Sequence, residues 1–177
     1  MIFHIIIPAR IESTRLPGKP LLDIAGKPMV QHVYERAIQT QANEVIIATD
    51  TPSIGMAVEE FGATVCMTHQ GHESGTDRIA EVVDKMAWDD DVVIVNVQGD
   101  EPLIPVDVIN QVALNLINNE EADCSTLYAN IDDAQDSEDP NIVKVVTDQK
   151  DMALYFSRSV IPHQRDKTAE AVTYKRH

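Results

Sequence analysis

The sequence IFHIIIPAR, residues 2–10, begins with an almost unbroken run of apolar, largely β-branched side chains. Such a run is typical of a β-strand that is buried on both faces, as in the middle of a parallel sheet. Pro8 lacks the N–H group that a strand needs in order to continue, so we expect the strand to cover residues 2–7. The loop that follows carries Arg10.

Similar apolar runs alternate with amphipathic segments as far as about residue 117. This alternation predicts an α/β fold with a mostly parallel central sheet flanked by helices. Because ligands bind beyond the carboxyl ends of the strands in such sheets, the loops that follow the first, third and fourth strands are the candidate sites. The expected strands after the first are residues 44–49, 64–67 and 91–97, and the expected helices begin near residues 28, 53, 77 and 105.

Local signals indicate where three of these helices begin. Pro28 is expected at the first helical position of the first helix, where the missing N–H group is not needed. Ser53 is expected to cap the second helix, which should end at Gly62. Thr76 or Asp77 is expected to cap the third helix.

The pattern changes from about residue 123, where the helical spacing is lost. Strand-like stretches follow, separated by acidic, turn-rich segments such as residues 132–140. We therefore expect one domain in two parts: an α/β core over residues 1–122 and a more mixed β extension over residues 123–177. The strand-like stretches are STLYANI (125–131), NIVKVVT (141–147) and MALYFSRS (152–159).

Composition limits the classes of protein to which this chain can belong. With 177 residues, 44% of them apolar, the chain is long enough for one domain with a core. The formal net charge of −15 argues against non-specific nucleic-acid binding, which needs a basic surface. No apolar run approaches the ~18 residues of a membrane span, and the opening run is too short for a signal peptide, so we expect a cytoplasmic protein. Cys66 and Cys124 lie in apolar runs, and we expect both to be buried rather than to form a metal site or a disulfide framework.

The loop over residues 8–20, PARIESTRLPGKP, gathers cations in a chain that has few of them. The chain has 14 lysines and arginines against 29 acids, yet Arg10, Arg15 and Lys19 all lie in this loop. Arginine pairs with phosphate oxygens, lysine adds a compact charge, and Gly18 lets backbone N–H groups approach a phosphate. The loop matches neither the Walker pattern nor the dinucleotide fingerprint. It predicts a phosphate site of another kind, against the alternative of a solvated loop with scattered surface cations.

Asp100 follows an apolar strand and a glycine, so its carboxylate should lie at the carboxyl end of that strand. Mg²⁺ prefers one or two carboxylates together with substrate phosphates and water. Asp100 is therefore a candidate ligand for Mg²⁺ near the phosphate site, with Glu101 as a nearby competitor and a simple turn aspartate as the alternative. A metal ion there would lower the pKa of a substrate hydroxyl and make it a nucleophile.

Four segments of the chain form a specific set in this order: IPAR-x₃-TRLPGKPL (7–21), HESGTDR (72–78), VNVQGDEP (95–102) and ALYFSR (153–158). Together they resemble the 3-deoxy-manno-octulosonate cytidylyltransferase family, over essentially the whole chain. The resemblance implies a nucleotide-diphospho-sugar-transferase-like fold and the transfer of CMP from CTP to 3-deoxy-D-manno-octulosonate (Kdo), with release of pyrophosphate, for lipopolysaccharide biosynthesis. It also implies Mg²⁺ as the cofactor, CTP and Kdo as the substrates, and a homodimer when the chain is full length.

The resemblance further implies roles for individual residues. The sugar's anomeric hydroxyl attacks the α-phosphorus of CTP, while the cations of the first loop offset the charge on the leaving pyrophosphate. The implied catalytic residues are Arg10, Arg15, Lys19 and Asp100, of which Asp100 is the metal ligand. The implied nucleotide-binding residues are Arg10, Ser13, Arg15, Lys19, His72, Ser74, Gly75 and Arg78. The implied sugar-binding residues are Gln98, Arg158, which would pair with the Kdo carboxylate, and His177.

Members of this family continue beyond the position at which this chain stops. The resemblance implies that the chain is truncated: it lacks a Gly-Ile-Tyr-Gly-Tyr segment, much of the dimer contact, and a Gly-Val-Asp motif with the second metal ligand. We therefore expect it to bind CTP but to turn over poorly. Transfer to a related ulosonate, such as 8-amino-Kdo, is the alternative within the same class. The alternative outside it is a module that binds a nucleotide without chemistry; such a relative would lack Arg15, Lys19 or Asp100, and all three are present.

Overall fold

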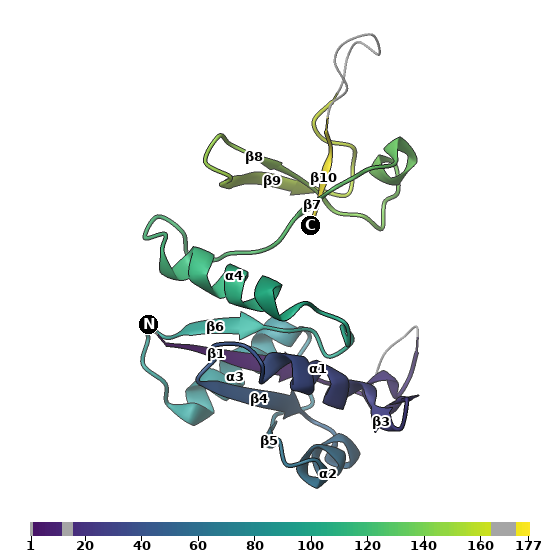
Figure 1. The fold of residues 1–177 in the computed structure, drawn as a ribbon, viewed down its shortest axis with the longest axis vertical. Helices are drawn as coiled ribbons and strands as arrows, with labels where there is room; N and C mark the ends of the chain where they lie inside the picture. The colour runs from purple at the N-terminus through teal and green to yellow at the C-terminus, as the bar shows by residue number, and fades with distance from the viewer. Residues whose placement is uncertain (1, 12–15, 164–172) are drawn as a thin grey trace. The chain divides into compact units, whose positions relative to one another are not determined.

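The computed structural model describes residues 2–11, 16–163 and 173–177. The chain divides into two compact units, Met1–Ser125 and Thr126–His177. Figure 1 shows the first unit as a sheet with helices packed on it and the second as a smaller sheet with loops.

A parallel sheet of four strands, in the order β5-β4-β1-β6, forms the centre of the first unit (Figure 1). Its strands are β1 (Phe3–Pro8), β4 (Glu44–Thr49), β5 (Thr64–Met67) and β6 (Val93–Asn96). The expected α/β class and parallel sheet are confirmed, and β4 and β5 have the predicted bounds. β1 lies in the interior of the sheet, which explains its almost unbroken apolar run, because neighbouring strands and helices on both faces remove it from water.

The end of β1 differs from the prediction by one residue. Pro8 pairs with Ala48 as the last residue of the strand rather than stopping the strand before it. The pairing persists because the N–H of the next residue, Ala9, donates to the carbonyl oxygen of Ala48 at 2.8 Å. A proline at the very end of a strand therefore removes no essential hydrogen bond.

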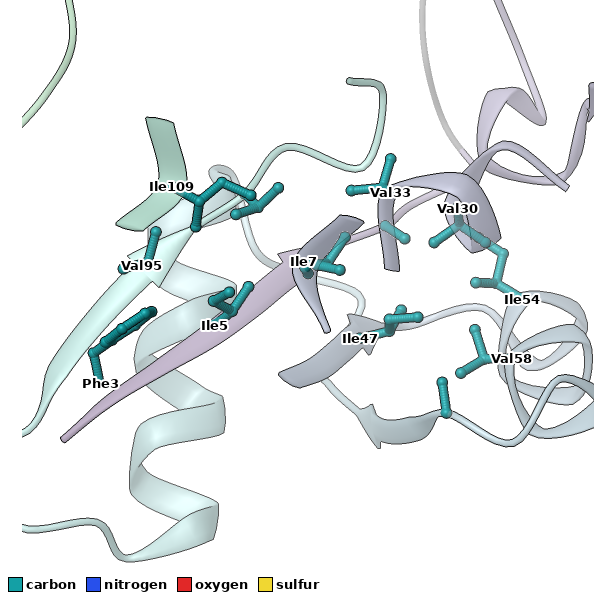
Figure 2. Close-up of a cluster of buried hydrophobic side chains, with 14 of the residues drawn as sticks. Phe3, Ile5, Ile7, Val30, Val33, Ile47, Ile54, Val58, Val95 and Ile109 are labelled. Atoms are coloured by element: carbon teal, nitrogen blue, oxygen red, sulfur yellow. The ribbon is translucent and has the colours of Figure 1, made fainter. Parts of the chain in front are cut away.

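Helices cover both faces of this sheet. α1, α2 and α4 pack on the face toward which Ile5 and Ile7 of β1 point (Figure 2). α3 packs on the opposite face, where its Val82 contacts the cluster around Ile6. None of the helices in the described residues is long and apolar enough to cross a membrane. The helices are α1 (Met29–Ala37), α2 (Pro52–Glu60), α3 (Gly75–Met86) and α4 (Val106–Ile117), and the short elements before α1 are η1 (Lys19–Leu21), β2 (Asp23–Ile24) and β3 (Lys27–Pro28).

The starts of the first two helices differ from the predictions. Pro28 occupies the capping position of α1 with an extended backbone, φ −63° and ψ 146°, rather than the first helical position. α2 begins at Pro52 and is preceded by Thr51, so the prediction that Ser53 caps it is wrong. Proline is favoured in the first turn because its missing N–H group would have no partner there. Gly62, with φ 80°, follows the end of α2, where a left-handed residue stops a helix.

The second unit is an antiparallel sheet in the order β7-β10-β8-β9, so the predicted β extension is confirmed. In its interior the ammonium group of Lys144 is fully buried. It donates to the carbonyl oxygens of Asp139, Ile142 and Arg158 at 2.5–2.9 Å, which ties the loop before β8 to the end of β9. The elements are β7 (Ala129–Asn130), η2 (Ala134–Ser137), β8 (Lys144–Thr147), β9 (Ala153–Ser157) and β10 (Lys175–Arg176).

The two cysteines lie in different surroundings. Cys66, in β5, is buried as predicted, and its burial raises the pKa of its thiol. Cys124 is exposed, so the prediction that it is buried is wrong. The reason is that Cys124 lies in an irregular segment after α4 and not in a strand.

Candidate active site

A cleft of about 740 Å³ opens at the carboxyl ends of the strands in the first unit. Its walls come from the loops that follow β1 and β6 and from the start of α3. This is the edge at which open α/β sheets bind ligands. The predicted site residues that line the cleft are Arg10, Lys19, Ser74, Gly75, Arg78, Gln98 and Asp100.

Lys19 and Asp100 form an ion pair in this cleft, with 2.6 Å between Nζ and Oδ2. Lys19 begins η1 directly after Gly18, whose φ of 74° lies in the left-handed region that favours glycine. Asp100 belongs to the loop after β6. The side chains are 31% and 48% exposed, so both remain accessible to a ligand. The structure therefore brings the predicted phosphate-binding lysine into direct contact with the predicted metal ligand.

Gly99 allows the loop after β6 to approach the end of β1. A Cβ atom at this position would lie 2.8 Å from the carbonyl oxygen of Pro8, which is closer than real Cβ atoms come. Any other residue at position 99 would therefore displace the loop that carries Gln98 and Asp100. Gly99 was not among the predicted site residues, although its position directly before Asp100 was the available signal.

The start of α3 forms one wall of the cleft and is held by a reciprocal capping box. Ser74 Oγ accepts a hydrogen bond from the backbone N–H of Asp77 at 3.1 Å, and Asp77 Oδ2 accepts one from the N–H of Ser74 at 3.2 Å. Ser74 is therefore the capping residue, and the prediction of Thr76 or Asp77 is wrong. The helix dipole places partial positive charge at Ser74 and Gly75, which suits an anionic or polar ligand.

Arg78, one turn into α3, is 2% exposed. It forms hydrogen bonds with residues that follow two strands at the same edge of the sheet. Its Nη2 donates to Oδ2 of Asp50 at 2.5 Å, and its Nη1 donates to Oγ1 of Thr68. Asp50 directly follows β4 and Thr68 directly follows β5. The guanidinium group that we predicted to bind the nucleotide thus also joins α3 to the ends of two strands.

Asp50 was missed by the sequence analysis, although its position directly after a strand was a usable signal. Burial acts to raise the pKa of its carboxyl group, but hydrogen bonds from Thr51 and Arg78 outweigh burial and lower the pKa below its usual value. Asp50 is therefore charged at neutral pH and neutralises the buried Arg78.

His72 lines a second cavity of the first unit, with a volume of about 250 Å³. His72 pairs through Nε2 with Oε2 of Glu81, which also accepts the backbone N–H of His69 at 2.8 Å. Oε1 of Glu81 pairs with Lys85 at 2.7 Å. Glu81 had no sequence signal beyond an ordinary helical i,i+4 pair with Lys85. The residues that line this cavity are Arg10, Ile11, Asp50, Thr51, Pro52, Gln70, His72 and Arg78.

The hydrogen bonds to Glu81 from Lys85, His72 and the backbone of His69 lower the pKa of its carboxyl group to about 2. A lowered folded-state pKa stabilises the fold above the unfolded value of 4.5, and this stability is lost as the pH falls from about 4.5 to about 2. We expect Glu81→Gln to lose less stability than the wild type between pH 7 and pH 3, measured as the shift in urea midpoint. The matched control is Glu60→Gln, which removes an exposed glutamate of α2 and should keep the wild-type pH dependence. Equal losses in Glu81→Gln and the wild type would contradict this assignment.

Four predicted site residues remain: Ser13, Arg15, Arg158 and His177. Ser13 and Arg15 lie outside the described residues. Arg158 and His177 belong to the second unit: Arg158 Nη1 donates to the carbonyl oxygen of Pro140 at 2.8 Å, and His177 Nε2 is hydrogen-bonded to Oγ1 of Thr126 at 2.8 Å.

The described side chains that line the cleft offer a magnesium ion one carboxylate, that of Asp100. Among the described residues, no three histidine, cysteine, aspartate or glutamate side chains are grouped so as to hold a metal ion. Asp100 supplies one carboxylate, and the phosphates of a nucleotide would supply the further oxygen ligands that Mg²⁺ prefers. The residues present therefore fit a Mg²⁺ ion that is shared with a bound nucleotide.

Comparisons with known proteins show the family to which the chain is similar. A family model described as cytidylyltransferase matches residues 4–177. The 3-deoxy-manno-octulosonate cytidylyltransferase of Haemophilus influenzae (strain PittGG) is 56% identical over 167 residues, which are 94% of this chain and 65% of that protein. The protein of the same name from Vibrio parahaemolyticus is 56% identical over 96% of this chain and 67% of its own length.

A solved structure has the same fold over the whole chain. It is that of CMP:2-keto-3-deoxy-manno-octonic acid synthetase complexed with CTP, and it is 46% identical, with a TM-score of 0.92 over 100% of this chain and 71% of that one. The present chain thus spans 65–67% of the length of the two curated relatives. The match to the family model and these identities confirm the resemblance on which the site prediction depended: the chain belongs to the cytidylyltransferase family.

Proposed function

We propose that this protein transfers CMP from CTP to Kdo and releases pyrophosphate. The observation that carries the proposal is the contact between Lys19 and Asp100 in a cleft that Arg10 also lines. It occurs in a chain 46% identical to a synthetase whose structure was solved with CTP. Cations for the phosphates and a carboxylate for a metal ion are the groups that nucleotidyl transfer requires.

The proposed reaction assigns a task to each wall of the cleft. The anomeric oxygen of Kdo forms a bond to the α-phosphorus of CTP, and the bond from that phosphorus to the oxygen shared with the β-phosphate breaks. The hydroxyl proton passes to water, and pyrophosphate leaves with increased negative charge. Lys19 and Arg10 offset this charge, and such positioning and electrostatic stabilisation provide most of the catalysis in phosphoryl transfer. The start of α3 holds the nucleotide, and Gln98 hydrogen-bonds the sugar.

Asp100 is the proposed protein ligand for Mg²⁺. When bound, the ion would neutralise phosphate charge and lower the pKa of the attacking hydroxyl. Asp100 also lies next to Lys19, one of the cations that would hold the triphosphate, which is the arrangement that a shared metal needs. The contacts of Arg158 and His177 with Kdo, the homodimer, the cytoplasmic location and the role in lipopolysaccharide biosynthesis stay predictions.

The proposal is tested by following pyrophosphate release from the full-length protein with CTP, Kdo and Mg²⁺. Product should form with CTP and fail to form with UTP or GTP at the same concentration. Replacing Kdo by 8-amino-Kdo tests the alternative within the same class, which is favoured if kcat/KM for the amino sugar is the higher value. Binding of CTP without release of pyrophosphate from it in the presence of either sugar would support the non-catalytic alternative and overturn the proposal.

Gly99→Ala should impair this reaction without a change of charge. The added methyl group would meet the carbonyl oxygen of Pro8 and displace the loop that carries Gln98 and Asp100. Misplacement of reacting groups by about 1 Å can lower rates by about 100-fold, so we expect kcat/KM to fall by about tenfold to 100-fold. The matched control is Gly55→Ala in α2, where the nearest atom is the flexible Met67 Sδ at 3.3 Å. Wild-type kinetics for Gly99→Ala would show that the loop has room for a side chain.

A further inference from the structure

Lys19 and Asp100 form an ion pair with each other, yet the proposed reaction requires a different partner for each of them. Lys19 has to contact phosphate oxygens, and Asp100 has to contact a divalent cation. In the structure the ammonium group neutralises the carboxylate at 2.6 Å. A ligand for either residue must therefore compete with the other residue.

The exposure of the pair shows that such competition is feasible. The two side chains are 31% and 48% exposed, and ion pairs that remain in contact with water are weak. A triphosphate carries several negative charges and offers charge-assisted hydrogen bonds, so it competes well for a lysine. A divalent cation that meets Asp100 alone has to displace a lysine and gains only one carboxylate, which is a poor site for Mg²⁺.

We propose that Lys19 and Asp100 exchange partners when the nucleotide binds: the triphosphate takes Lys19 and thereby releases Asp100 for the divalent cation. Nucleotide and cation then bind with positive coupling, and the cation arrives at the cleft only together with the nucleotide. Because coupling between two ligands is reciprocal, the cation also strengthens nucleotide binding. This inference rests on the proposed function, since it assumes that the cleft binds CTP.

A double-mutant cycle on metal-free binding tests the exchange. Affinity for CTP in the presence of EDTA is measured by calorimetry for the full-length protein with Asp100→Asn, Lys19→Met, both changes or neither. Asp100→Asn removes a charge that repels the triphosphate in either background. If the pair must also break, Asp100→Asn gains more affinity when Lys19 is present, because only then does it remove a competitor for the lysine. The expected excess is about 1.5- to fivefold, the range typical of an exposed ion pair.

The sign of the coupling separates this proposal from its alternative. In the alternative, Lys19 stays paired with Asp100 while it contacts the phosphates, and so it screens the carboxylate from them. Asp100→Asn then raises the affinity for metal-free CTP by the same factor with Lys19 present as without it, or by a smaller one. That result would overturn the proposal. A second result would also overturn it: none of the four proteins binds metal-free CTP, although the wild type binds CTP when Mg²⁺ is present. If the wild type binds no CTP even with Mg²⁺, the proposed function itself is wrong. Asp107→Asn, at an exposed aspartate in the first turn of α4, is the matched control and should leave metal-free binding unchanged in both backgrounds.

Discussion

Asp100→Asn is expected to lower kcat of the full-length protein at least about 100-fold at saturating CTP, Kdo and Mg²⁺. The loss of one preorganised group that stabilises transition-state charge lowers rates by about 10²–10³-fold, and Asp100 is the proposed protein ligand of the metal ion. The side chain keeps its size, and the partly exposed pair with Lys19 contributes little to stability. The thermal midpoint should therefore change little. The measurement is pyrophosphate release in steady state.

The same variant gives opposite results in two assays if both proposals hold. Turnover with Mg²⁺ should fall, whereas affinity for metal-free CTP should rise. Asp107→Asn, which removes a carboxylate of the same size outside the cleft, should leave both unchanged. A kcat for Asp100→Asn within tenfold of the wild type would show that Asp100 is not the metal ligand.

Asp50→Ala is expected to lower the free energy of unfolding by about 3 kcal/mol. Arg78 is 2% exposed, and the change removes the carboxylate that pairs with its buried guanidinium group. Removing one partner of a buried ion pair costs about 3–5 kcal/mol, and the 15% exposure of the Asp50 side chain places the expected value at the lower end. The measurement is chemical denaturation of the purified chain at pH 7.

Two comparisons isolate the effect of the buried charge. Glu35→Ala breaks the Lys27–Glu35 pair, whose side chains are 45% and 37% exposed, and should lower stability by less than about 1 kcal/mol. Asp50→Ala combined with Arg78→Met should be more stable than Asp50→Ala alone, because no unpaired charge then remains buried. A double variant that is less stable than Asp50→Ala would indicate that Arg78 stabilises the fold mainly through Thr68 or through packing.

The sequence by itself determined the elements whose signal is local. The run at residues 2–7 predicted a strand buried on both faces because almost all of its side chains are apolar, and β4 and β5 agree residue for residue with the apolar runs that predicted them. Errors occurred where one residue can serve in two ways. Pro8 can close a strand or precede a loop, and Ser74, Thr76 and Asp77 are each able to cap a helix.

Only the tertiary structure decided which charged groups meet. Lys19 and Asp100 are separated by 81 positions, and Arg78 and Asp50 by 28. No single helix or strand in the described residues carries both members of either pair, so their pairing cannot be read from helical or strand periodicity. The residues themselves predicted that Lys19 binds phosphate and that Asp100 lies at a strand end, and the resemblance to the family implied that Arg78 lies near the nucleotide. The order of the strands, β5-β4-β1-β6, brings the loops that carry them to one edge. Pairing between charges depends on distance in space, and that distance is set by the packing of the sheet rather than by spacing along the chain.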